Sequence, residues 1–319
     1  MFGRIDRNFT GSDGSFGVTR RTDVALFVGL TLLWGLSFPV IEVGLDYLPP
    51  LLFAALRYDV AAVVLLAYTA IRVDGRLPRG RDDFLAVVAG GLFLVAGNGL
   101  LFLGQRTVPS GAAAIITSLI PLVTVLWAFV LVGERRSPLA LVGVVLALVG
   151  TGLVVQPDPE SLLAGDTVGR LLIVGQVVSV ALGGVLVQRA RPSLGTVPLT
   201  AWSMVLGALV LHLLSSGVGE TPGAEATTPT AVAAVVYLGI FSTAIAFLIY
   251  FTILARHGAF EVTLIQYAVP VVATVVGVVV LGETIEPATI AGFGVIVLGF
   301  VAVKRRAISE LLEGHTAPS

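Results

Sequence analysis

The chain repeats one pattern of proline, glycine and glutamate, and the separation between the two copies is constant. The first copy starts at Pro121 and the second at Pro270, and the remaining positions align without a gap. The pairs, each 149 residues apart, are Pro121/Pro270, Gly133/Gly282, Glu134/Glu283, Pro138/Pro287, Gly143/Gly292 and Gly150/Gly299. Self-similarity at a fixed separation marks a duplicated unit. We therefore interpret the chain as two related halves.

The composition is that of a membrane protein. Of the 319 residues, 56% are hydrophobic and only 12% are charged, whereas a soluble domain carries about 25% charged residues. The net charge of −1 gives no electrostatic basis for binding nucleic acid. The chain has no cysteine, which excludes disulfides and thiol catalysis, and its three histidines are far apart in sequence. We expect no metal site and no cofactor.

Ten apolar segments of membrane-spanning length follow one another along the chain. Their expected bounds are 24–43, 51–71, 84–105, 109–132, 138–156, 168–188, 197–216, 231–254, 260–281 and 287–303. The polar stretch 1–23 is basic like the start of a signal peptide, but the next apolar run is long, contains Pro39 and lacks a small-residue cleavage site. We therefore expect a retained first helix, with tails at 1–23 and 305–319.

The distribution of basic residues orients these segments. With the N-terminus inside and the segments alternating, sixteen Lys and Arg residues fall in cytoplasmic stretches, whereas the external stretches hold only Arg106 and Arg170. This excess follows the positive-inside rule. Both termini are therefore expected in the cytoplasm.

A repeat of five segments crosses the membrane an odd number of times, so the second copy must be inverted. The expected fold is an all-α integral membrane protein with ten transmembrane helices in two inverted five-helix repeats. These repeats cover 24–156 and 168–304 and are joined by an external linker at 157–167. Inverted repeats are typical of secondary transporters, whose solute site lies near the membrane midplane between the halves. The sequence therefore predicts a carrier that works by alternating access.

A family resemblance rests on the first two segments and on the repeated turns. The first segment contains Leu33-Trp34-Gly35-Leu36-Ser37-Phe38-Pro39, Pro49-Pro50 precedes the second, and Arg57 lies early in the second. With the Gly-Glu turns after segments four and nine, this pattern resembles the EamA-like family of the drug/metabolite transporter superfamily over nearly all of 24–304. The resemblance implies an exporter of amino acids, metabolites or toxic compounds, multi-pass in the cytoplasmic membrane of a prokaryotic cell. The second half departs from it, with Val174-Gly175-Gln176 in place of a Trp-Gly start.

Three charged residues lie within the predicted helices or at their mouths. Arg57 is a functional candidate because a charge in hydrocarbon is costly; alternatively, it reaches the external headgroups or pairs with Glu42 or Asp46. Asp59 either serves a proton-linked step or is a neutral acid hydrogen-bonded to a neighbouring helix. Glu261 opens the ninth segment, where it either stabilises the helix N-terminus or acts as a gating or coupling acid. A proton is therefore the candidate coupling ion.

Uncharged polar and aromatic residues at mid-membrane are the candidates for a solute cavity. A buried amide or hydroxyl must find a partner, which a solute or a neighbouring helix can supply. Trp34 and Phe38 suit either a cavity wall or ordinary packing. The complete set is Trp34, Phe38, Asn98, Gln176, Ser179, Tyr250, Gln266 and Tyr267.

Proline is expected to break two of the helices. Pro121 and Pro270 fall inside segments four and nine, where each removes a backbone hydrogen bond. Broken helices at equivalent places of two halves point to a binding region. We expect these segments to face each other across the cavity. His212 is expected to be a packed or interfacial residue.

Small residues form a seam on segments five and ten. Gly143, Ala147 and Gly150 share one face, and Gly292 and Gly299 repeat the spacing. Small residues let helices approach closely. This seam is a packing surface and the candidate interface of a homodimer.

Enzyme motifs are missing from the sequence, which has neither a phosphate-binding loop nor a Ser/His/Asp set. The expected partners are a small-molecule solute and the lipid bilayer, and we expect a transporter and not an enzyme. The alternatives are an integral-membrane enzyme or lipid-handling protein that uses the same cavity, and a sensor or scaffold without flux.

Overall fold

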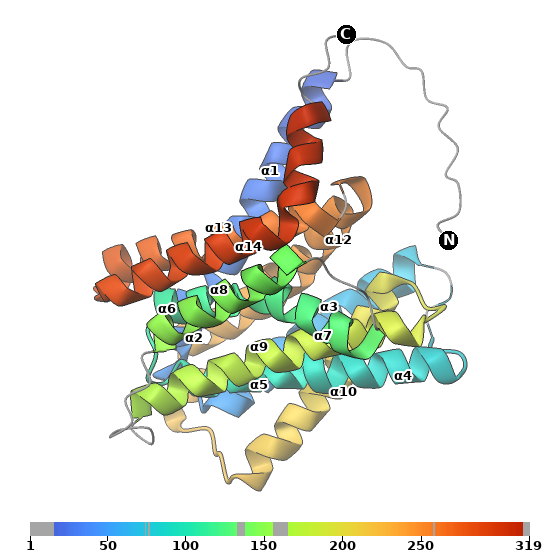
Figure 1. The fold of residues 1–319 in the computed structure, drawn as a ribbon. Helices are drawn as coiled ribbons and strands as arrows, with labels where there is room; N and C mark the ends of the chain where they lie inside the picture. Colours follow the sequence, from blue (N-terminus) through green and yellow to red (C-terminus); the bar gives the residue numbers. More distant parts are fainter. Residues whose placement is uncertain are drawn as a thin grey trace.

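The computed structural model describes residues 16–314 except 74, 76, 133–137, 156–164 and 258, and every regular element in that part of the chain is helical (Figure 1). Eight helical stretches are long and apolar enough to cross a membrane: Thr22–Leu45, Pro50–Arg72, Arg81–Gly104, Ser110–Leu131, Asp166–Ala190, Thr196–Gly217, Pro229–His257 and Val262–Leu281. Two further helices, α8 (Pro138–Val155) and α14 (Pro287–Gly314), lie where the remaining two segments are expected. That all ten cross the membrane stays a prediction. The first Gly-Glu turn, at 133–134, lies outside the described residues.

Some of these stretches are single helices and others are interrupted. The unbroken ones are α3 (Pro50–Arg72), α9 (Gly165–Ala190) and α10 (Thr196–Gly217). In the first half, the interrupted stretches are α1 (Phe16–Gly35) with α2 (Ser37–Leu45), α6 (Ser110–Thr117) with α7 (Ile120–Val132), and the series α4 (Arg81–Ala89), η1 (Gly90–Val95), η2 (Ala96–Asn98) and α5 (Gly99–Gly104). In the second half, they are α13 (Ala259–Val276) with η5 (Gly277–Leu281), and the series α11 (Pro229–Val236), η4 (Tyr237–Ile245) and α12 (Ala246–His257). A short 3₁₀ turn, η3 (Ala224–Thr227), precedes α11.

The repeated prolines have different local roles. Pro138 and Pro287 start α8 and α14, where the missing N–H is not needed and the fixed φ suits the first turn. Pro121 is the second residue of α7, directly after the break that separates α7 from α6. Pro270 lies inside α13, and the helix continues through it.

Two π-helical elements occupy matching places in the two halves. Every residue of η1 has its counterpart, 149 residues further along, inside η4. A π turn shifts the register of the helix around it and is frequent at functional sites. The 149-residue correspondence therefore includes an irregular feature that the proline and glycine pattern does not mark.

Helix contacts pair the first half with the second. The central pairs are α3 with α10, α6 with α13, and α8 with α14. The helices α8 and α14 run side by side in Figure 1. The flanking contacts come in matching sets: α1 packs against α13 as α9 packs against α7, and α12 against α1 as α5 against α9. The core lies between these helices, and Phe53 on α3 meets Phe102 on α5 edge to face, with ring centroids 5.2 Å apart.

The α8–α14 pair approaches closely at the predicted glycine seam. A Cβ added at Gly150 would lie 2.7 Å from the carbonyl oxygen of Gly292, and one added at Gly292 would lie equally close to the carbonyl oxygen of Gly150. Only glycine fits at both positions without a shift of the backbones. These glycine faces therefore contact each other inside the chain. A homodimer through these helices stays a prediction, and it would use outer side chains such as Leu148.

Two carboxylates connect the ends of α10 to neighbouring helices. Glu220, just beyond α10, accepts hydrogen bonds from the first-turn N–H groups of Leu51 (3.1 Å) and Leu52 (2.8 Å) on α3. Asp83, in the first turn of α4, accepts from the N–H groups of Ser193 (2.7 Å) and Leu194 (3.0 Å) just before α10. Each carboxylate satisfies N–H groups that otherwise lack a partner.

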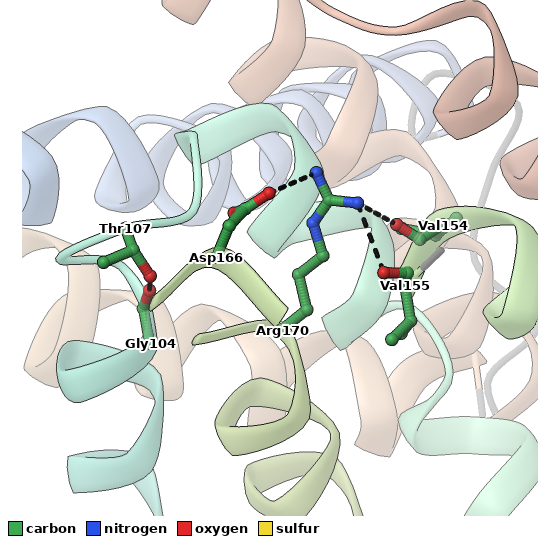
Figure 2. A network of polar contacts seen from close by, with 6 residues as sticks. All are labelled: Gly104, Thr107, Val154, Val155, Asp166 and Arg170. Atoms are coloured by element: carbon green, nitrogen blue, oxygen red, sulfur yellow. Dashed lines mark hydrogen bonds and ion pairs between the residues drawn. The ribbon is translucent and has the colours of Figure 1, made fainter. Parts of the chain in front are cut away.

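A buried arginine joins α8 to α9. Figure 2 shows the guanidinium of Arg170 between the carboxylate of Asp166, at 2.9 Å, and the carbonyls of Val154 and Val155, at 3.0 and 3.3 Å. The carbonyls of the last turn of a helix lack intrahelical partners, and a cation is favourable there. Arg170 therefore holds the end of α8 against the start of α9. In the same view Thr107 donates to the carbonyl of Gly104.

Candidate solute cavity

A cavity of about 390 Å³ lies between the two halves. The first half lines it with α1, α2, α3, η1, η2, α5, α6 and α7, and the second half with α9, α12 and α13. Its polar lining is Ser37, Arg57, Tyr58, Asn98, Thr117, Thr124, Gln176, Gln188, Tyr250 and Gln266. Its apolar lining includes Trp34, Phe38 and Phe247. A mainly apolar cavity with a few convergent polar groups is the usual form of a small-molecule site.

Most of the residues expected from the sequence meet in this cavity. Those that line it are Trp34, Phe38, Arg57, Asn98, Gln176, Tyr250 and Gln266. Ser179 and Tyr267 are not among the lining residues. The hydroxyl of Ser179 donates to the carbonyl of Phe93 at 3.0 Å, and the ring of Tyr267 packs on that of Phe300, with centroids 4.4 Å apart. These two side chains therefore join helices.

Arg57 is held inside the protein. Its side chain is buried, and its Nε donates to the hydroxyl of Thr243 on η4 at 2.8 Å. The guanidinium carbon lies 5.2 Å from the ring centroid of Tyr58 and 5.9 Å from that of Phe102, within cation–π range. Among the described residues no carboxylate pairs with it, so the expected pairing with Glu42 or Asp46 is not present. A buried guanidinium that lines a cavity can bind a carboxylate in the paired geometry typical of arginine.

An amide chain crosses the cavity wall from the second half to the first. Nε2 of Gln176 on α9 donates to Oδ1 of Asn98 at 3.2 Å, and Nδ2 of Asn98 donates to the carbonyl of Leu94 at 2.6 Å. Oε1 of Gln176 is buried and has no hydrogen-bond partner in the described part of the chain. Gln176 therefore makes an interhelical hydrogen bond through Nε2 and keeps Oε1 as an acceptor without a partner in the described residues. A solute N–H group could satisfy that acceptor.

Aromatic rings from both halves form the apolar side of the cavity. The ring centroid of Trp34 lies 5.6 Å from that of Tyr250 and 6.2 Å from that of Phe247. Phe247 and Tyr250 are themselves 6.1 Å apart and nearly edge to face. Such clusters present a rigid apolar wall with a hydroxyl at its rim.

Asp59, a second charged candidate, lies away from the cavity. Oδ2 of Asp59 on α3 is 2.7 Å from Nε2 of His212 on α10, and both side chains are partly exposed on the outer surface. This pair gives Asp59 the interhelical partner that one interpretation of the sequence required. The structure does not describe the side chain of Glu261.

Several lining residues were not expected from the sequence. Tyr58, Gln188 and Phe247 carry no distinctive pattern, because such residues are common in membrane helices. Ser37 belongs to the motif of the first segment but was not a candidate for the cavity. Thr117 and Thr124 did carry a signal: they are seven residues apart on either side of Pro121, a spacing that puts them on one helix face.

The comparison with protein families agrees with this arrangement. The sequence model of the EamA-like transporter family matches residues 22–156 and, separately, residues 167–304. The chain belongs to the EamA-like transporter family. Members of this family are transporters, and this chain is accordingly a multi-pass membrane transporter of a bacterial inner membrane, with a small-molecule solute as its partner.

Individual relatives cover nearly the whole chain. An "Uncharacterized inner membrane transporter YedA" of Escherichia coli (strain K12) is 31% identical over 280 residues, which are 88% of this chain and 89% of that protein. A "Probable terminal-alkyne amino-acid exporter" of Streptantibioticus cattleyicolor is 30% identical over 89% of this chain and 93% of that one. A crystal structure with 24% identity superposes with a TM-score of 0.63 over 90% of this chain and 98% of its own, which supports the fold alone.

Proposed function

We propose that this chain is a secondary exporter of small amphipathic, amino-acid-like solutes, working by alternating access between two inverted five-helix halves. The observation that carries the proposal is the cavity at the junction of the halves, which combines the buried Arg57 guanidinium, the free Oε1 acceptor of Gln176 and the aromatic wall around Trp34. These groups complement a carboxylate, an amine and an apolar side chain respectively.

The inverted arrangement has support from two independent sources. The main helix contacts between the halves stay the same when each apolar segment is exchanged for the one five segments away, and the family model matches each half separately. Two similar halves related by an in-plane axis can exchange conformations and so expose one site to each side in turn. In this proposal all ten helices cross the membrane and both termini are cytoplasmic.

The open side of the cavity follows from the course of α9. The lining residues Gln176, Val180, Gly184 and Gln188 follow one face of α9 from its middle to its last turn. In the orientation that the basic residues predict, this end is cytoplasmic. We therefore interpret this conformation as inward-facing, ready to receive a solute from inside the cell.

Solute counterflow in proteoliposomes tests the proposal. The purified chain should exchange labelled amino acids or related zwitterions with an internal pool, saturably and above protein-free liposomes. Arg57→Gln should weaken exchange strongly by raising the KM, whereas Arg106→Gln, at an exposed arginine, should leave exchange intact. If a broad panel of such solutes gave no exchange above protein-free liposomes, the proposal would be wrong, and an enzyme or lipid-handling role of the cavity would become the better hypothesis.

Single-cysteine labelling tests the orientation, because the natural chain contains no cysteine. Cysteines in place of Arg79 and Ser193 should react with a membrane-impermeant reagent only from the cytoplasmic side. Cysteines in place of Arg106 and Glu225 should react only from outside. Labelling of all four from one side would contradict the topology.

A further inference from the structure

Two carboxyl groups meet at the first N–H groups of α6. Oε2 of Glu42 on α2 and Oε1 of Glu283, which follows η5, both accept from the N–H of Ser110 at 2.9 Å. Oε2 of Glu283 also accepts from the N–H of Gly111 at 3.3 Å. Glu42 belongs to the first half and Glu283 to the second, so this contact joins the halves. Glu42 lies one helical turn beyond Phe38, at the end of the cavity opposite Gln188.

The repeated Gly-Glu turn brings Glu283 into this position. Gly282 has φ = +71°, a left-handed conformation that ends the helix, and the N–H of Glu283 then bonds to the carbonyl of Gly277 at 3.0 Å. The chain folds back so that the Glu283 carboxyl lies against Gly277, where a Cβ would overlap it. The hydroxyl of Ser110 lies at the same place, 2.8 Å from that Cβ position.

Ser110 adds a second, independent observation. Its side chain is fully buried, and its Oγ has no hydrogen-bond partner among the described residues although it lies beside the Glu283 carboxyl, next to the same position over Gly277. Buried hydroxyls nearly always have a partner. We therefore infer that the Ser110 hydroxyl hydrogen-bonds to a bound species at this site.

The charges around the pair favour a bound proton. Among the described residues, the other charged or titratable side chains at this end of the molecule include Asp46, Tyr47, Arg57, Arg106, Asp166, Arg170, Glu220, Glu225 and Glu286. Asp46 acts on Glu42 with a further negative charge. Arg57 donates to Thr243, and Arg170 pairs with Asp166. No described cation forms an ion pair with the carboxyl group of Glu42 or of Glu283. Two adjacent carboxylates without a cation cannot both ionise at low cost, whereas one negative charge suits a helix N-terminus.

We propose that Glu42 and Glu283 form a proton-binding site that keeps the external side of the cavity closed. One carboxyl carries the proton, the other is the carboxylate, and Ser110 completes the hydrogen bonds between them. Release of the proton to external water leaves two carboxylates that repel each other, which separates α2 from the Glu283 turn and opens the external side. This role rests on the transporter function proposed above and supplies it with a coupling ion.

The test uses the full chain in proteoliposomes with one introduced cysteine, Ala114→Cys, in the cavity wall. Its labelling rate by an impermeant external thiol reagent is divided at each pH by that of a cysteine at the exposed position Arg106, because thiol reactivity itself rises with pH. This relative rate should rise about tenfold or more from about pH 6 to about pH 9, because two ionised carboxylates repel each other. Glu42→Gln and Glu283→Gln remove the second charge and should keep the relative rate low at every pH. The matched control Glu286→Gln should retain the rise.

Solute counterflow in the same vesicles separates this site from the transport function. Counterflow without a pH-dependent labelling rate in the parent protein would overturn the proton site and leave the exporter intact. A pH-dependent rate that both Gln variants lack, without any counterflow, would support the site and overturn the exporter. If the Gln variants do not fold, the infrared spectrum of the parent protein decides: a protonated carboxyl band that disappears as the pH rises is expected, and its absence overturns the site.

Discussion

Arg57 on α3 donates a 2.8 Å hydrogen bond to Thr243 on η4, so a cation of the first half is oriented by the second half. The guanidinium is buried and lines the cavity, yet no described carboxylate neutralises it. A charge buried without a counter-ion is costly. The cost is offset when a solute supplies the missing negative charge.

Replacement of Arg57 should therefore act on solutes that carry a carboxylate. Hydrogen bonds to charged groups contribute about 1.5–3 kcal/mol, so Arg57→Gln should raise the KM for amino-acid export by about tenfold to a hundredfold. Arg57→Lys should recover only part of this, because lysine lacks the paired donors. Amino-acid amides should be affected less than acids. Equal effects on both would contradict a carboxylate contact.

Gln176→Leu should separate two roles of the Gln176 side chain, the hydrogen bond to Asn98 and the free Oε1 acceptor. Loss of the bond to Asn98 should lower the thermal stability slightly, since such interhelical bonds contribute about 1 kcal/mol or less. Loss of the Oε1 acceptor should raise the KM several-fold. The control is Ser179→Ala on the same helix, which removes an interhelical bond outside the cavity and should change stability alone. An unchanged KM in Gln176→Leu would assign Gln176 to packing.

Glu220→Ala should destabilise the α3–α10 pair. The substitution leaves the N–H groups of Leu51 and Leu52 and the hydroxyl of Ser215 without their acceptor, at a cost of about 1–3 kcal/mol. Melting in detergent, followed by size-exclusion chromatography, should show a lower Tm. Glu225→Ala, at an exposed glutamate in η3, serves as the control and should leave Tm unchanged.

Gly150→Ala should separate α8 from α14. The added Cβ would lie 2.7 Å from the carbonyl oxygen of Gly292, so the helix backbones must move apart, and overpacking of this kind costs about 1–3 kcal/mol. Gly152→Ala is a matched control on the same helix, because nothing lies within 4 Å of its Cβ position. It should be neutral or slightly stabilising. Equal Tm values for the two variants would contradict the close approach.

Asp59→Asn should leave pH-dependent transport intact. Asp59 is hydrogen-bonded to His212 on the outer surface and does not line the cavity, so it has no contact with the solute site. Proteoliposome counterflow at several pH values should match that of the parent protein, with a lower Tm. Loss of the pH dependence would move the coupling role from the Glu42–Glu283 pair to Asp59.

The sequence predicted the helices and most of the cavity for identifiable physical reasons. Membrane-length apolar runs are strong signals, so each expected segment overlaps an observed helix. Asn98 and Gln176 stood out because amides are rare and costly in apolar helices. Ser179 looked the same in sequence but faces Phe93, because residue type does not tell which helix face meets the cavity.

The interactions that the sequence could not indicate are those between distant segments. The pairing of Asp59 with His212 requires the relative heights of α3 and α10, which local patterns do not contain. The meeting of Glu42 with Glu283 depends on a single left-handed glycine that turns the chain back. The repeated Gly-Glu pair predicts a turn, but the residues that the glutamate carboxyl contacts depend on how distant helices pack together.

The π turns η1 and η4 have a consequence for how the solute site is built. Each inserts extra backbone into a helix that carries cavity residues beyond it: Asn98 follows η1, and Phe247 and Tyr250 follow η4. One residue corresponds to about 100° of rotation around a helix axis. If either helix were a regular α-helix along its whole length, the side chains that follow the π turn would be rotated away from the cavity. One side of the cavity would then lose its lining. The two π turns thus set the orientation, around each helix axis, of the side chains that contact the transported molecule.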